Sequence, residues 1–228
     1  MQTDMTVGKP MKMLLNFTIP VFLGNVFQQL YSMADAVIVG KFVGTKGLAA
    51  VGATGTITFL IIGFLMGLTT GFTVLTSQKF GAGRMDEMRK TVGNAAILSV
   101  VIAVVMTAVS MLGMHRLLVF MHTPEDIFDG AYGYIMIICA GIFTQVLYNL
   151  VSSILRALGN SKTPLYFLIL AAVLNIVLDL VFIIFFHWGA PGAAWATVYF
   201  TGSVRSSLPD LYVEGRAGTK DEKRRLVF

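Results

Sequence analysis

The sequence is poor in charge and in cysteine. Only 13% of its 228 residues are charged, against about a quarter in soluble domains, while 56% are hydrophobic and the mean hydropathy is +0.77. The single cysteine, Cys139, excludes a disulfide framework and is expected to serve in packing. The three histidines do not pair with cysteine or glutamate at zinc-ligand spacing, so no such site is expected. This composition excludes an ordinary soluble domain and indicates an integral membrane protein.

Five segments are apolar and long enough to cross a bilayer as helices, which takes about 20 residues. They are residues 13–39, 48–77, 92–114, 131–155 and 164–186. A sixth apolar segment begins at Gly192 but is interrupted by Arg205, so this helix is expected to be incomplete. The sequence therefore predicts an all-α integral membrane fold, with residues 1–204 as a transmembrane region and 205–228 as a charged tail.

Basic residues in the connections predict the orientation, because Lys and Arg accumulate on the cytoplasmic side. A cytoplasmic N-terminus puts eight of them inside and three outside. The inner ones are Lys9, Lys12, Lys79, Arg84, Arg89, Lys90, Arg156 and Lys162, and the outer ones are Lys41, Lys46 and Arg116. The inner connection SQKFGAGRMDEMRK is expected to form a short basic helix on the membrane surface. These charges fit topology signals and lipid contacts in a multi-pass cell-membrane protein, and no nucleic acid partner is expected.

Asp35 and Asp179 are lone carboxylates inside otherwise uncharged spans. An ionised carboxylate in hydrocarbon costs several kcal/mol, so such residues normally face a bundle interior and mark an ion or substrate path. Counted from Lys41 and Trp188 at 1.5 Å per residue, both lie in the outer half of the bilayer and could share a cavity. Asn175 lies one turn before Asp179 and adds a carbonyl oxygen. Such an oxygen cluster suits sodium or a proton.

Polar residues in spans also have a structural interpretation, namely hydrogen bonds that hold helices together. For Asn175 alone that interpretation is equally good. For two carboxylates at one depth it is weaker, because asparagine would do the same without the ionisation cost. Packing or interface anchoring is the preferred interpretation of four further polar residues: Gln28, Gln29, Tyr31 and Tyr148.

Proline and glycine also occur within the predicted spans. Pro20 removes a backbone hydrogen bond and should kink the first span, either as a hinge or as a static bend. Gly63, Gly67 and Gly71 follow one another at four-residue spacing in the second span, a pattern typical of close helix packing in lipid.

Five stretches, in order, resemble one known family. They are IPVFLGNVFQQLYSMADAVIVGKFVGTKGLAAVG, SQKFGAGR, LRALGNSKTP, NIVLDLVFI and GAAWATV. From about residue 8 to 200 the sequence resembles the multidrug and toxic compound extrusion (MATE) family of cation-coupled exporters. Members of that family have two six-helix lobes and work by alternating access, and this chain is similar to the N-terminal lobe. The tail from residue 205 departs from the family pattern, either as foreign sequence or as a natural extension.

The resemblance implies a role for each matching residue. The coupling cation, sodium or a proton, is expected at Asp35, Asn175, Asp179 and Thr197. The substrate cavity is expected to include Asp35, Asn149 and Asp179, and Pro20 matches the family's helix-bending proline. No cofactor other than the coupling ion is implied.

The function expected from these residues is export of cationic or amphiphilic drugs in exchange for inward sodium or protons. Two alternatives stay open: a truncated, non-transporting membrane fragment, and a half-size transporter that requires a partner lobe. An intramembrane enzyme is disfavoured, because the sequence has no Ser and His pair, HExxH motif or clustered acids at membrane depth. The carried compounds and the choice between sodium and protons also stay open.

Overall fold

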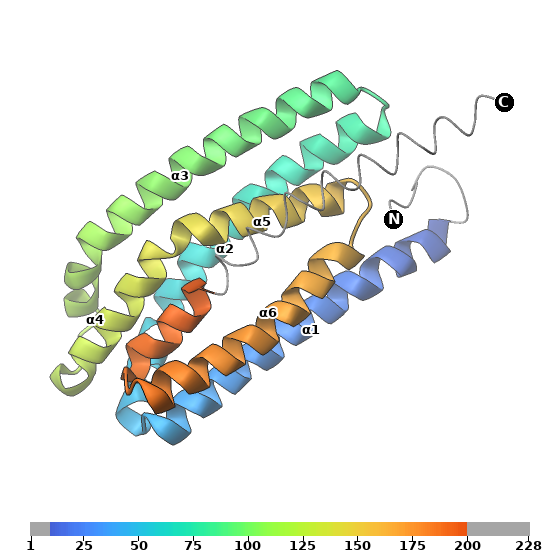
Figure 1. The fold of residues 1–228 in the computed structure, drawn as a ribbon. Coiled ribbons are helices and arrows are strands. Elements are labelled where there is room, and N and C mark those ends of the chain that lie inside the picture. The colour runs from blue at the N-terminus through green and yellow to red at the C-terminus, as the bar shows by residue number, and fades with distance from the viewer. Residues whose placement is uncertain (1–9, 200–228) are drawn as a thin grey trace.

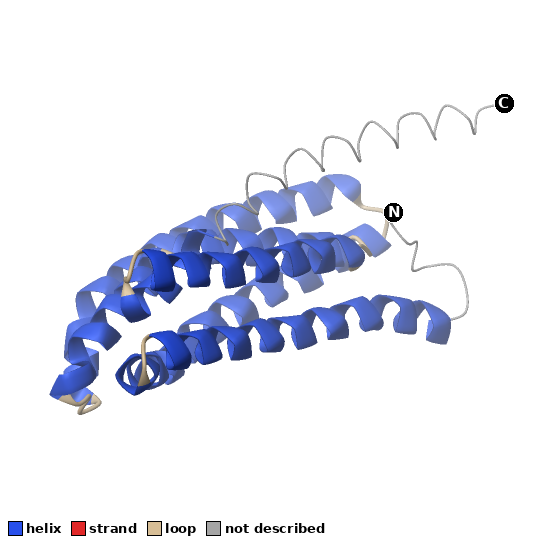
Figure 2. Cartoon of the chain, turned by 60° about the horizontal axis from the view of Figure 1, so that its bottom comes forward, coloured by secondary structure: helices blue, strands red, loops and turns tan. Residues whose placement is uncertain are grey.

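The computed structural model describes residues 10–199, which are helical apart from short turns and contain no strand (Figures 1 and 2). The helices are α1 (Pro10–Phe42), α2 (Thr45–Gly81), α3 (Met85–Phe120), α4 (Glu125–Ala140), α5 (Ile142–Ala157) and α6 (Lys162–Leu180). The last continues into a π-helical turn, η1 (Val181–Phe185), and residues 189–199 are helical again. The predicted tail and the end of the sixth span lie outside the described residues.

The five predicted spans are confirmed. Four helices are long and apolar enough to cross a membrane, namely Met11–Phe42, Thr45–Gly81, Met85–Phe120 and Lys162–Phe185, and α4 with α5 forms a fifth, bent span. The helices are longer than predicted, however, because α2 and α3 have 37 and 36 residues. At 1.5 Å per residue each is about 55 Å long, against a hydrocarbon core of about 30 Å.

The inner connection does not form a separate surface helix, so that prediction was wrong. Its residues extend α2 and α3 instead, and only residues 82–84 lie between the two helices. Gly83 has φ of +69°, which permits this tight reversal. Glu87 then forms ion pairs with Lys79 and, at 3.5 Å, with Arg84, so the two helix ends are joined by charge as well.

The fourth span is broken at Gly141, where α4 and α5 meet at an angle of 47°. Thr144 Oγ1 donates a hydrogen bond of 2.7 Å to the Gly141 carbonyl oxygen. The same oxygen also accepts the Gln145 N–H over 3.1 Å, so the hydroxyl adds a second donor at the break. The sequence predicted one span here, over residues 131–155, because its apolar run is continuous across the break.

The helices form two groups. α2, α3, α4 and α5 pack together, whereas α1 lies along α6, as Figure 1 shows in blue and orange. Gly24 of α1 lies at this pairing, where a Cβ would be in ordinary contact with Leu168 at 3.5 Å. The α1–α6 pair contacts the other group through α2 and α5.

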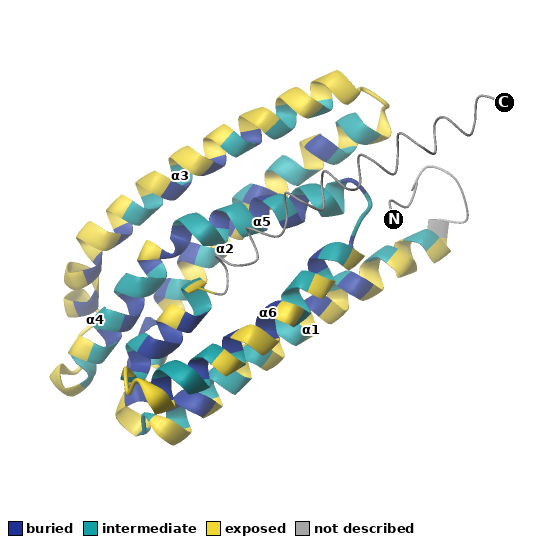
Figure 3. Ribbon diagram, viewed as in Figure 1, coloured by how far each residue is buried: buried dark blue, intermediate teal, exposed yellow. Residues whose placement is uncertain are grey.

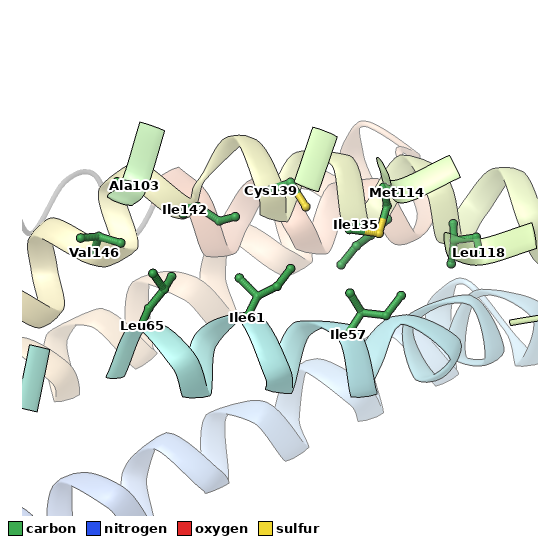
Figure 4. Close-up of a cluster of buried hydrophobic side chains, with 10 residues drawn as sticks. All are labelled: Ile57, Ile61, Leu65, Ala103, Met114, Leu118, Ile135, Cys139, Ile142 and Val146. Atoms are coloured by element: carbon green, nitrogen blue, oxygen red, sulfur yellow. The ribbon is translucent and has the colours of Figure 1, made fainter. Parts of the chain in front are cut away.

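The main hydrophobic core lies inside the four-helix group. Ten buried side chains from α2, α3, α4 and α5 point toward one another (Figure 4). They are Ile57, Ile61, Leu65, Ala103, Met114, Leu118, Ile135, Cys139, Ile142 and Val146. Large apolar residues also cover the outer faces of α1, α2 and α3, which are mostly exposed in Figure 3. Exposed apolar faces around a packed interior are what a protein surrounded by lipid requires.

Gly63, Gly67 and Gly71 lie on the exposed face of α2. A Cβ built on any of the three would have no neighbour within 4 Å. Among residues 10–199, therefore, no helix uses these glycines for the close packing that their spacing predicts.

Replacing Leu118 with alanine should lower the free energy of unfolding by about 2–3 kcal/mol. Leu118 is fully buried, so the shorter side chain leaves a cavity and loses packing contacts that lipid cannot restore. Leu112→Ala, on the same helix but 84% exposed, is the matched control and should have little effect. Thermal unfolding of both variants in detergent measures the difference, and equal stabilities would contradict the described packing of α3.

Candidate cation and substrate site

The packing of α1 against α6 brings together the carboxylates that the sequence singled out. Asp35 lies on α1 and is half-buried, whereas Asp179 on α6 is fully buried. The two side chains are close enough for their charges to repel each other. Asn175, one turn before Asp179 on α6, is also fully buried. Three of the four predicted cation ligands therefore come from one pair of neighbouring helices.

Most oxygens of this cluster have no internal partner. Both carboxylate oxygens of Asp179, Oδ1 of Asp35 and Oδ1 of Asn175 lack a hydrogen-bond donor among residues 10–199. The ion pairs found in the same part of the chain involve neither aspartate. A buried acceptor without a partner costs free energy, and a buried, unpaired charge costs considerably more. The arrangement is therefore suited to a bound cation or proton that supplies the missing partner.

Thr197 reaches this cluster from the helical segment 189–199. Asn175 Nδ2 donates to Thr197 Oγ1 over 3.5 Å, and Thr197 Oγ1 donates to the Ala193 carbonyl oxygen over 3.1 Å. The segment approaches closely because its inner face consists of small residues: Ala190, Ala193, Ala194 and Ala196, all buried. All four predicted cation ligands are thus placed in one region by three separate helices.

A cavity of about 310 Å³ lies next to Asp35 and Thr197. Its walls come from α1, α2, the junction of α4 with α5, and the segment 189–199. They are formed by Gln28, Tyr31, Ser32, Asp35, Ala36, Val51, Thr58, Ile61, Ile62, Leu65, Tyr134, Ile138, Gly141, Ile142, Gln145, Thr197 and Val198. A mostly apolar wall with a few converging polar groups is typical of a small-molecule site.

Not every predicted cavity residue lines this space. Asp179 does not, although it interacts electrostatically with Asp35. Asn149 on α5 does not line it either, and its Nδ2 is buried without a partner among the described residues. Pro20 lies inside α1, which runs without interruption from Pro10 to Phe42. The roles predicted for these residues stay predictions.

The cavity also contains residues that the sequence interpretation did not assign to it. Gln28 and Tyr31 had been interpreted as packing or interface residues, and Tyr134 had not been singled out. Both tyrosines lie within electrostatic range of Asp35 and Asp179. Tyr31 precedes Asp35 by four residues on the same helical face, a signal that could have identified it. Tyr134 meets the site only through the packing of α4, which sequence spacing does not encode.

The candidate cation ligands are all oxygen atoms, although they come from different chemical groups. The described residues include no group of three His, Cys, Asp or Glu side chains that could hold a metal ion. The oxygens available here come from two carboxylates, one amide and one hydroxyl. Oxygen ligands of this kind suit hard, weakly held cations rather than a tightly bound transition metal.

Comparison with known proteins shows which family this sequence matches. The family model described as MatE matches residues 20–181. The chain is similar to YpnP of Bacillus subtilis (strain 168), a probable multidrug resistance protein, with 34% identity over 87% of this chain and 45% of that protein. It is also similar to YoeA of the same organism, another probable multidrug resistance protein, with 31% identity over 81% of this chain and 41% of that protein.

Solved structures agree. One is described as an outward-facing conformation of a multidrug resistance MATE family transporter of the MOP superfamily. It superimposes with a TM-score of 0.84 and 29% identity, over 88% of this chain and 44% of that chain. The chain thus spans less than half the length of the relatives it matches.

Replacing Asp179 with asparagine should raise the free energy of unfolding by about 1 kcal/mol or more in sodium-free alkaline buffer. The amide has nearly the same shape but does not bury an unpaired charge. Asp126→Asn, which alters an exposed carboxylate 3.6 Å from Lys46, is the control and should change little. Thermal unfolding in detergent measures both variants. A clear loss of stability in Asp179→Asn would show that this carboxylate is already compensated within the protein.

Proposed function

The chain belongs to the MatE family, and from this premise we propose that it forms the first half of a secondary active exporter. The exporter would expel cationic or amphiphilic compounds in exchange for inward sodium or protons, by alternating access. The proposed cycle contains no covalent step, so the protein is not an enzyme in this account. The second half of the transporter, which the relatives' length implies, would complete the substrate cavity.

One observation carries the proposal: buried carboxylate oxygens that have no hydrogen-bond partner within residues 10–199 lie beside a cavity between helices. A carboxylate that only held helices together would be paired with a donor. Instead, Asp35 belongs both to the oxygen cluster and to the cavity wall, and Thr197 does as well. A cation bound at the cluster and a compound bound in the cavity would therefore interact with the same two side chains.

Competition for these side chains gives the exchange mechanism. We assign the coupling cation to Asp35, Asn175, Asp179 and Thr197, and the substrate contacts to Asp35, Asp179 and Asn149. A sodium ion or proton that enters neutralises one carboxylate and weakens the attraction that holds a cationic compound. The membrane potential assists each inward positive charge by about 2.3 kcal/mol per 100 mV and opposes each outward one equally, so it drives the exchange when more positive charge enters than leaves. Outward release of the compound and inward movement of the cation are then coupled by charge.

The location proposed for the chain is the cell membrane, with the N-terminus in the cytoplasm. The distribution of basic residues supports this orientation, because the turn at residues 82–84 carries more Lys and Arg around it than the turn near Lys46. The lipid bilayer, the exported compounds and the second lobe are the partners in this proposal.

Labelling of introduced cysteines tests the orientation. In a Cys139→Ser background, a membrane-impermeant maleimide added to intact cells should label Thr123→Cys but not Ala82→Cys. The two residues lie in turns at opposite ends of α3. Inside-out vesicles should give the reverse pattern. Labelling of both positions from one side would contradict the proposed topology.

Replacing Asp35 or Asp179 with asparagine should abolish cation-driven efflux. The test protein is a chimera in which residues 1–199 of this chain replace the matching first half of YpnP. Uptake of a fluorescent organic cation into inverted vesicles, whose lumen corresponds to the cell exterior, is measured with an outward sodium or proton gradient imposed separately. Asp126→Asn, an exposed carboxylate, is the control and should pump normally. Retained coupled efflux in Asp179→Asn would contradict the site assignment.

A further inference from the structure

The segment 189–199, which carries Thr197, is positioned by contacts at glycine residues. Gly133 of α4 faces Pro191, since a Cβ at that glycine would lie 3.2 Å from the proline ring. Gly192 lies against Trp188, with a corresponding distance of 3.2 Å. Gly141, at the bend between α4 and α5, faces Val198 more closely still. The segment therefore approaches its neighbours where side chains are missing.

The space around Gly141 leaves no room for a side chain, whereas its backbone conformation does not require glycine. Its φ of −78° and ψ of −7° are accessible to other residues. A Cβ built there, however, would overlap Cγ2 of Val198 and lie 3.3 Å from Cβ of the same valine. Val198 directly follows Thr197, so a backbone shift that relieves the overlap also moves the threonine.

The contact between Thr197 and Asn175 has little tolerance for such movement. Its 3.5 Å separation already lies at the outer limit of a hydrogen bond. Gly141 and Thr197 also line the same cavity. A displacement of the segment away from the bend would thus change both the oxygen cluster and the cavity wall.

We propose that Gly141 is a positioning residue for the coupling-cation site: by accommodating Val198 at the bend between α4 and α5, it sets where Thr197 stands relative to Asn175 and Asp35. This inference rests on the proposed function, because it assigns Gly141 a role in cation binding. Gly141 itself does not contact the cation. It acts through the position of the segment 189–199.

Sodium binding to the full chain provides one test. Thermal unfolding in nanodiscs is followed while sodium chloride replaces choline chloride at constant ionic strength, and acid pH replaces sodium in a parallel series. Gly141→Ala should weaken the cation-dependent stabilisation at least tenfold in apparent affinity, in addition to whatever stability the overlap itself costs without added cation. Gly141→Ala/Val198→Ala should restore the affinity, because the overlapping methyl group is then absent. Normal affinity in Gly141→Ala, or no recovery in the double variant, would overturn the proposal.

The same substitution at open positions is the matched control. Gly63→Ala and Gly67→Ala also add one methyl group to a helix of this chain, but with no neighbour within 4 Å. Both should leave the cation affinity unchanged. A loss equal to that of Gly141→Ala would mean that any added methyl group perturbs the site, and the specific role of Gly141 would be refuted.

A disulfide cross-link separates this inference from the proposed function. In a Cys139→Ser background, the yield of a disulfide between Asn175→Cys and Thr197→Cys reports how close the two positions lie, because the bond forms only over a narrow range of distances. Adding Gly141→Ala should reduce the yield at least several-fold, and Val198→Ala should restore it. If the yield follows this pattern but neither sodium nor acid pH stabilises the chain, positioning by Gly141 holds and the proposed cation coupling fails. An unchanged yield refutes positioning whatever the cation does.

Discussion

The dominant constraint on this molecule is the cost of keeping ionisable oxygens inside a bundle surrounded by hydrocarbon. Asp179 and Asn175 are fully buried on α6, and their acceptor atoms lack donors in the described part of the chain. Hydrophobic packing alone would favour apolar residues at both positions, because lipid offers nothing to an unpaired carboxylate. Two packing features enclose these groups: α1 pairs with α6, and the segment 189–199 approaches closely.

The residues that stabilise the four-helix group are largely different from those that form the candidate site. Ten apolar side chains hold the four-helix group together, and among them only Ile61, Leu65 and Ile142 also face the cavity. The polar residues of the site come largely from α1, α6 and the segment 189–199, which lie outside that group. Substitutions in the oxygen cluster can therefore alter binding without removing the contacts that hold the bundle together.

The sequence predicted most of the fold and part of the site. Apolar length alone identified all five spans, and charge depletion identified Asp35 and Asp179, because both signals are local and carry large free energies. The bend at Gly141 was missed, since the apolar run is continuous across it and Val198, which packs against this glycine, comes from a distant segment. Tyr134 was missed for the same reason: tertiary packing, and not spacing along the chain, turns it toward the aspartates. The surface helix expected in the inner connection failed because basic amphipathic sequence is equally compatible with the ends of long helices.

The unusual length of α2 and α3 has a mechanical consequence. To fit about 55 Å of helix within about 30 Å of hydrocarbon by tilt alone would need an angle of about 57°, beyond the range of about 0–40° found for membrane helices. Both must therefore extend beyond the hydrocarbon, and the hairpin that joins them carries four charges suited to water or headgroups, Lys79, Arg84, Arg89 and Lys90. Drawing these cations into the acyl chains, or lifting them away from anionic headgroups, costs free energy in either direction. The charges of the hairpin thus resist movement of the bundle along the membrane normal in both directions.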